Sequence, residues 1–186
     1  MTKPKPPKDA SEFLSALLDK EHSEEETLAH INMNGASMKE RIIYFVDEVN
    51  PETYAYFLTA FNKMQETSGD IRVFINTPGG DVAVMFSMYD LIRGSKRKVV
   101  TIGTGDIVSA GVMILAAGHE RYVTENAVLM AHLGFAEWLC NIEEISARNK
   151  YIEWHKERFA SILANRSNYT VRKWRDILEK KSELWL

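Results

Sequence analysis

Apolar positions along residues 41–102 recur in two different periods, one typical of strands and the other of helices. Short apolar runs at residues 42–46, 72–76 and 99–102 predict three strands, the first of them apolar throughout. Between these runs, apolar residues return every three or four positions, which predicts two helices that each bury one face. The order strand, helix, strand, helix, strand indicates a layered α/β domain with right-handed crossovers.

The two predicted helices have favourable start signals. Asn50 and Pro51 suit the beginning of the first helix, and the glycine pair Gly79 and Gly80 precedes the second. Their buried faces are formed by Tyr54, Phe57, Phe61 and Met64, and by Val82, Met85, Tyr89 and Ile92. Later in the chain, short apolar runs at 122–124 and 128–131 precede a long, charged helical region from about residue 142 to 165, which we expect to project and to pack against another subunit.

The most apolar stretch of the chain runs from Val99 to Gly118. Polar residues and glycines interrupt it, so its apolar pieces are shorter than the roughly 20 residues that a bilayer requires. We therefore interpret it as a buried strand followed by a buried helix, and we expect no membrane association.

Composition and charge narrow the functional classes. The chain has 186 residues, of which 45% are hydrophobic and 26% charged, with a net charge of −3 and no basic stripe, which makes nucleic acid an unfavourable partner. The single cysteine, Cys140, forms no internal disulfide or thiolate cluster, and the start of the chain lacks the apolar segment of a secretion signal. We expect a cytoplasmic protein that requires no metal and no cofactor. The division that we predict is an N-terminal tail with a short amphipathic helix (Asp9 to Leu18) in residues 1–35, followed by one domain in residues 36–186.

Two short motifs contain groups that can carry chemistry, the glycine turn in INTPGGD and the serine, Ser109, in GDIVSAGVM. Each lies where a predicted strand ends and a helix begins. The first N–H groups of a helix have no internal partner, and the helix dipole is positive there, so a nearby oxyanion would be stabilised. Taken alone, the glycine pair is also compatible with an ordinary tight turn and the serine with a helix N-cap.

A serine hydroxyl needs a base to act as a nucleophile at neutral pH, and histidine is the usual one. His132 ends the apolar run VLMAH, so its ring is presented at the end of a predicted strand. The remaining histidines lie in polar or turn segments, or on the charged helix, and are interpreted as ordinary surface residues: His22, His30, His119 and His155.

Five segments between residues 39 and 132 together resemble the proteolytic subunit of the Clp protease, ClpP, of peptidase family S14. These segments are KERIIYF, INTPGGDV, SMYDLI, GDIVSAGVMILAAG and RYVTENAVLMAH. The resemblance implies the ClpP/crotonase fold, an α/β superhelical core of repeated β-β-α units with a projecting long helix. Residues 36–186 would then form a ClpP-like serine peptidase domain.

Transferred position by position, the resemblance implies that Ser109 is the nucleophile and His132 the general base. The backbone N–H groups of Gly80 and Ala110 would form the oxyanion hole. Family members carry an aspartate shortly before an aromatic residue after the long helix, and Glu183 stands two residues before Trp185 here. An ungapped alignment from the helix instead places Glu179, Lys180 or Lys181 at this position.

The function implied is that of an ATP-dependent-type serine endopeptidase that cleaves unfolded polypeptides inside a heptameric ring or double ring, supplied by a Clp-type AAA+ ATPase. The chain departs from the family pattern at its N-terminus, in the segment LGFAEWLCN after the histidine, and at its short C-terminus. Three alternatives therefore stay open. They are a catalytically silent ring subunit, an ATPase-independent peptidase like the phage head-maturation proteases, and an acyl-CoA enzyme of the crotonase type, against which the serine and histidine argue.

Overall fold

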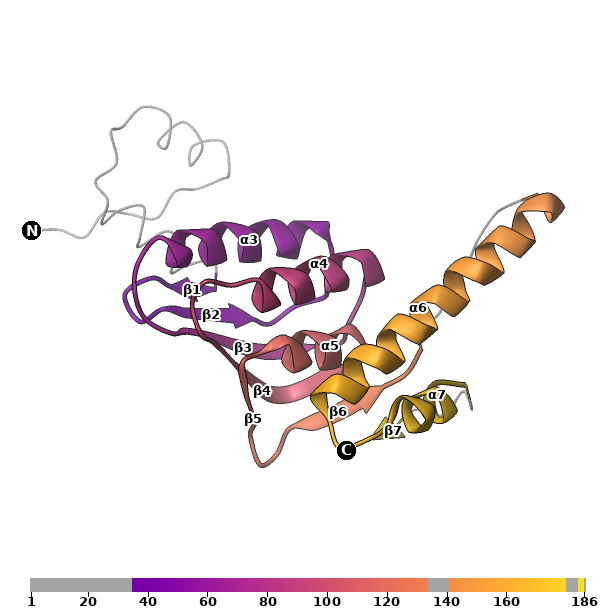
Figure 1. Cartoon of the computed structure of the whole chain (residues 1–186). Coiled ribbons are helices and arrows are strands. Elements are labelled where there is room, and N and C mark those ends of the chain that lie inside the picture. The colour runs from indigo at the N-terminus through magenta and orange to yellow at the C-terminus, as the bar shows by residue number, and fades with distance from the viewer. Residues whose placement is uncertain (1–34, 134–140, 180–183, 186) are drawn as a thin grey trace, which may run out of the picture.

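The computed structural model describes residues 35–133, 141–179 and 184–185 (Figure 1). The predicted helix from Asp9 to Leu18, Cys140 and Glu183 lie outside the described residues, so the predicted boundary between residues 35 and 36 stays a prediction. The strands are β1 (Ala36–Ser37), β2 (Ile42–Phe45), β3 (Ile71–Thr77), β4 (Val99–Val108), β5 (Glu120–Val123), β6 (Val128–Ala131) and β7 (Leu184–Trp185). The helices are α3 (Pro51–Gln65), α4 (Val82–Arg93), α5 (Ala110–Ala117), α6 (Ile145–Arg166) and α7 (Val171–Glu179), with a short 3₁₀ turn, η1 (Ile142–Glu144), before α6.

All described strands belong to one seven-stranded sheet, in the order β1-β2-β3-β4-β6-β7, with β5 also paired to β4. The pairs β2–β3, β3–β4, β4–β5 and β4–β6 are parallel, whereas the small strands β1 and β7 are antiparallel to their neighbours. Strand β4 has two successive partners along one edge. Its first half pairs with β5, and its second half pairs with β6. The predicted α/β fold class is confirmed.

Helices α3, α4 and α5 lie in a layer on one side of the sheet (Figure 1). Helix α3 starts with a capping box in which the Asn50 side chain accepts from the backbone of Thr53, and Thr53 in turn bonds the backbone of Asn50. Helix α4 is capped by Asp81, which accepts from Val84 N at 2.8 Å. Of the predicted face residues, Phe57, Phe61, Met64, Met85 and Ile92 are among the most deeply buried side chains, whereas Tyr54, Val82 and Tyr89 are partly buried. Helix α4 also buries Val84, Phe86 and Met88, which the spacing did not predict.

The apolar stretch from Val99 to Gly118 forms strand β4 and helix α5, as predicted. Seven residues of α5 are buried, so this helix is enclosed and not amphipathic. Strand β4 extends to Val108, six residues beyond the predicted end, because the chain continues through Gly105 at φ 59° and shifts register against β3. This longer strand leads directly into Ser109.

The long helix is confirmed, and it runs away from the rest of the fold (Figure 1). Among its 22 residues, the buried ones lie only near its C-terminal end, at Phe159, Ala160 and Leu163. Helix α7 packs beside it through Trp174 and Leu178. In the part of the chain that the structure describes, no helix combines the length and apolarity needed to cross a bilayer.

Strand β2 is apolar, as predicted, and its Tyr44 is 46% exposed and stacks on Phe74 with a centroid separation of 5.5 Å. One sequence expectation needs correction. His155 is not an ordinary surface residue. Both of its ring nitrogens are buried, because Phe86 of α4 stacks against its ring at 5.3 Å.

Candidate active site

Ser109 stands between β4 and α5 in an unusual backbone conformation. Its φ is 54° and its ψ −112°, a region that non-glycine residues rarely occupy. It holds the N-cap position of α5, yet its side chain makes no capping hydrogen bond. The interpretation of Ser109 as an ordinary helix cap is therefore wrong, and its hydroxyl is not engaged by the helix that it precedes.

Hydrogen bonds from neighbouring elements hold this junction. The N–H of Ser109 donates to the carbonyl of Met130 on β6 at 2.7 Å, and its carbonyl accepts from Val112 N at 3.1 Å inside α5. Ala110 is the first residue of α5, and the first N–H groups of a helix have no partner within it.

The glycine turn lies directly against Ser109. A Cβ placed on Gly79, which has φ 95°, would stand 2.7 Å from the Cβ of Ser109 and 3.2 Å from the N of Ala110. Only glycine permits this approach, since a side chain would collide with the junction and the positive φ would strain it. The two motifs, which are far apart in the sequence, are therefore in contact in the fold.

The turn is also fixed from its other side. The carbonyl of Gly79 accepts from Val49 N, and the N–H of Asp81 donates to Val49 O, both at 2.7 Å. The N–H of Gly80 takes no part in this bridge. Inside the sheet, the buried hydroxyl of Thr77 accepts from Gly79 N at 3.1 Å. Val49 and Thr77 were not predicted as site residues, because Val49 acts through its backbone, which no side-chain pattern reveals.

His132 follows β6, the strand that runs parallel to the second half of β4. The register pairs Val108 with Met130, so Ser109 and His132 leave the carboxyl ends of neighbouring strands. The two residues line the same cavity, together with Gly79, Gly80 and Ala110, in a volume of about 480 Å³. The structure thus brings together four of the five predicted site residues.

The fifth predicted residue, Glu183, lies outside the described part of the chain. Its covalent neighbour Leu184 begins β7 and pairs with Ala131, the residue before His132. The alternative candidate Glu179 is at the end of α7, where its carboxylate lies 3.4 Å from the ammonium of Lys156. Glu179 is therefore engaged elsewhere.

The other described histidines do not line this cavity. The Nδ1 of His119 accepts from Val99 N at 3.1 Å, and burial, with Arg93 and Arg166 nearby, lowers its pKa. Burial and the positive charge of Arg158 also lower the pKa of His155. His22 and His30 lie outside the described residues.

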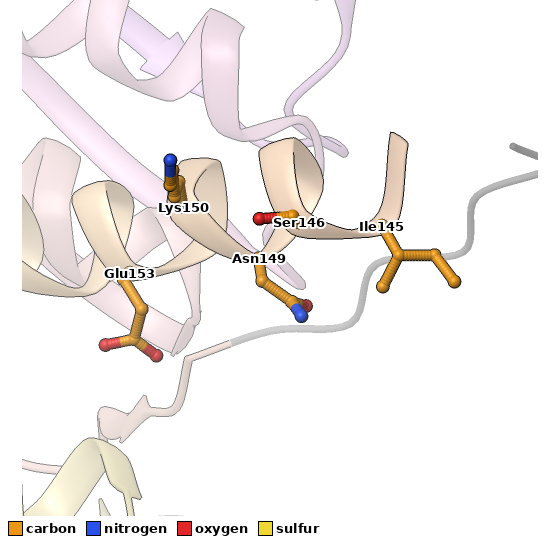
Figure 2. A pocket seen from close by; sticks show the side chains of 5 residues that line it. All are labelled: Ile145, Ser146, Asn149, Lys150 and Glu153. Atoms are coloured by element: carbon orange, nitrogen blue, oxygen red, sulfur yellow. The ribbon is translucent and has the colours of Figure 1, made fainter. Parts of the chain in front are cut away.

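A second hollow follows the first turns of α6, lined by Ile145, Ser146, Asn149, Lys150 and Glu153 (Figure 2). All these residues come from one helix, and Lys150 and Glu153 point to opposite sides of it in this view. They do not converge on a common point, so this hollow is not a candidate for catalysis. Within the described ranges, no cluster of three or more His, Cys, Asp or Glu side chains could hold a metal ion.

The sequence model of the Clp protease family matches residues 21–184. The chain belongs to the Clp protease family. Its structure is also similar to that of a mutant form of ClpP1 from Listeria monocytogenes, with a TM-score of 0.72 and 25% sequence identity over 80% of this chain and 84% of that one. The ClpP-like fold that the sequence motifs implied is therefore confirmed, and the fold is that of a ClpP-like peptidase.

Segments that resemble the family also meet at the candidate site. In this Clp protease family chain, the contact between Gly79 and Ser109 joins two of the five segments that carried the resemblance. The family match starts at residue 21 and leaves the first 20 residues outside it.

Proposed function

We propose that this protein is a serine endopeptidase in which Ser109 attacks the peptide bond and His132 acts as general base. The observation that carries the proposal is the common cavity. It is lined by a serine whose hydroxyl makes no capping bond, by a histidine at the end of a strand and by the glycine turn. Acyl transfer requires a nucleophile, a base and amide donors around one reacting carbon, and these residues supply one of each.

In the proposed reaction, Ser109 Oγ bonds to the scissile carbonyl carbon while its proton passes to His132. The carbonyl oxygen becomes negatively charged and accepts from the N–H groups of Gly80 and Ala110, an interaction for which the loss of one donor costs roughly 3 kcal/mol in known enzymes. The C–N bond then breaks, and His132 gives its proton to the leaving amine. Water, deprotonated by His132, cleaves the resulting ester and restores the Ser109 hydroxyl.

We assign the orienting acid to Glu183. Leu184 pairs with Ala131 in an antiparallel register, and Glu183 and His132 are the covalent neighbours of these two residues. A carboxylate beside the base would hold the imidazole in the tautomer that accepts the serine proton. The engagement of Glu179 by Lys156 favours Glu183 over the nearest alternative.

We further propose that the protein works as a cytoplasmic ring, with the cavities facing a chamber that admits unfolded polypeptides. Membership of the Clp protease family supports ring formation, and the projecting helix α6 supplies exposed surface for it. A Clp-type AAA+ ATPase is the expected supplier of substrate, and an assembly that trims bound partners without ATP is the alternative.

Labelling by a fluorophosphonate reagent tests the nucleophile. We expect the wild type to be labelled, Ser109→Ala not to be labelled, and His132→Ala to react at least about 100-fold more slowly. Ser161→Ala, at an exposed position of α6, is the matched control and should react like the wild type. Equal labelling of the wild type and Ser109→Ala would contradict the proposal. If neither is labelled, the protein is a catalytically silent ring subunit.

A further inference from the structure

Among the described residues, one acidic residue, Glu48, lines the cavity at Ser109. In the part of the chain that the structure describes, Glu48 and His132 are the two lining residues that can ionise, and none is a lysine or arginine. Glu48 lies in the connection between β2 and α3, far from both site motifs in sequence. The hydrophobic pattern gave no signal for it, because it belongs to no periodic face.

The backbone of Glu48 is held on both sides. Its N–H donates to Asp47 Oδ1 at 2.7 Å, and its carbonyl accepts from Thr53 Oγ1 at 2.7 Å. The next residue, Val49, forms the bridge to Gly79 and Asp81. The carboxylate of Glu48 is therefore attached to a fixed point of the chain, immediately beside the glycine turn.

The remaining side chains that line the cavity are mainly apolar. They include Val82 and Met85 from α4, Met130 from β6, and Leu133 and Phe159. Among the described residues that line it, the cavity thus offers an apolar wall and one carboxylate, and none of them is a cation that could neutralise a negatively charged substrate. A carboxylate at the edge of an apolar site attracts cationic side chains and repels anionic ones.

We propose that Glu48 determines substrate specificity by selecting peptides that carry Lys or Arg within about three residues of an apolar residue at the scissile bond. The inference rests on the proposed peptidase function. Because Glu48 is adjacent in sequence to the residue that bridges Gly79 and Asp81, its carboxylate lies within the span of a few residues of an extended peptide whose carbonyl points at Gly80. Lysine and arginine have long, flexible side chains, which adds reach.

Fluorogenic peptides that share a leucine at the scissile bond and differ only by Lys, Gln or Glu at each neighbouring position test this inference. At low ionic strength, we expect the wild-type kcat/KM to favour the Lys peptide over the Gln peptide by about fivefold at the best position, the upper range for a partly solvated ion pair, with the Glu peptide poorer still. Glu48→Gln should remove the preference and Glu48→Lys should reverse it. The preference should weaken at 0.5 M salt, where the screening length is roughly 4 Å.

Glu52→Gln is the matched control, because Glu52 is an exposed carboxylate in the first turn of α3 that does not line this cavity. It should keep the wild-type preference. Melting temperatures of all variants should agree with that of the wild type, since the carboxylates are exposed. Equal cleavage of the Lys, Gln and Glu peptides by the wild type, or an unchanged preference in Glu48→Gln, would overturn the inference.

Peptide binding separates this inference from the proposed reaction. The Ser109→Ala protein cannot form an acyl-enzyme, so the anisotropy of labelled peptides reports binding alone. The Lys peptide should bind more tightly than the Glu peptide, and Glu48→Gln in the same background should abolish the difference. If the wild type cleaves nothing but this binding pattern appears, the peptidase proposal fails and the role of Glu48 stands. If binding is indifferent to charge, the role of Glu48 fails.

Discussion

At the scale of single residues, the conformation of Ser109 is the feature that most distinguishes the site. A left-handed φ costs a non-glycine residue roughly 1–2 kcal/mol, and Ser109 recovers none of it through a capping bond. The conformation persists because Met130 holds the N–H and Gly79 packs against the Cβ. The sequence predicted which serine stands at the strand–helix junction. It could not predict the strain, because the backbone angle is set by Met130 of β6 and by Gly79 in the turn after β3.

The proposed role of Glu183 as the orienting acid can be tested by replacing its carboxylate with an amide. We expect Glu183→Gln to lower kcat on the order of 10⁴-fold, because an amide would no longer hold the imidazole in its productive tautomer. The measurement is peptide hydrolysis at pH 7.5.

Glu179→Gln is the control for the orienting acid. It loses only the exposed ion pair with Lys156, which is worth at most about 1 kcal/mol of stability, and should keep full activity. The opposite result, with Glu179→Gln inactive and Glu183→Gln active, would transfer the role to Glu179.

At the scale of elements, periodicity predicted the helices better than the strands. The faces around Phe57 and Met85 follow directly from the spacing of three and four, because a helix that packs on a sheet buries a continuous stripe. The predicted end of β4 was wrong. Gly103 and Gly105 interrupt the apolar pattern, but the backbone continues to pair with β3. Side-chain patterns do not record such backbone pairing.

Helix α6 is attached to α4 through an aromatic cluster around His155. The imidazole stacks on Phe86, and Tyr151 and Trp154 meet it edge-on at 4.2 and 4.8 Å. Arg158 lies over Phe86 at 4.4 Å and reaches Asp90 at 3.5 Å, so a cation is already present beside the ring. One turn further along, Phe159 lines the cavity at Ser109. The cluster therefore connects the packing of α6 with the shape of the site.

This cluster predicts a loss of stability in acid. Burial lowers the pKa of His155 in the folded protein below its ordinary value near 6.5, so the unfolded chain binds the proton more readily. The contribution of His155 to the free energy of unfolding should be complete above about pH 6.5. It should fall as the pH drops below that value, with a slope of at most about 1.4 kcal/mol per pH unit. Urea unfolding between pH 7.5 and 5 measures the slope.

His155→Phe provides the comparison, because phenylalanine keeps the ring and cannot be protonated. Its slope should be smaller than that of the wild type, although not zero, since the pKa of His119 is lowered too and contributes with the same sign. Identical slopes for the two proteins would show that His155 is protonated as easily in the folded state as in the unfolded one.

At the scale of the whole molecule, the first half of α6 contains none of the helix's buried residues, which are Phe159, Ala160 and Leu163. Ile145, Tyr151 and Trp154 are 47%, 48% and 53% exposed. Large apolar side chains that gather on a projecting helix are typical of surfaces that another chain covers. Together with family membership, this supports the prediction that the long helix packs against a neighbouring subunit.

Ile145→Asp tests that prediction. Aspartate suits the first turn of a helix, so the substitution should leave α6 intact while placing a charge in the proposed contact. Native mass spectrometry should give a multiple of the 21.3 kDa subunit mass for the wild type and a smaller assembly for Ile145→Asp. Ser161→Asp, which adds the same charge at an exposed position nearer the core, should assemble like the wild type. A wild type that is monomeric at high concentration would argue against the ring.

One edge of β4 pairs with two strands in succession, and only the second of them leads to the candidate site. The second half of β4, with β6, leads to Ser109 and His132, whereas its first half pairs with β5, whose residues are all exposed. The connection from β5 to β6 is a tight turn in which Ala127 N donates to Thr124 O at 3.0 Å, and the turn residues are not among the described residues that line the cavity. Lengthening this connection should leave Ser109 and His132 in place, so it is the natural position for a fluorophore or an affinity handle.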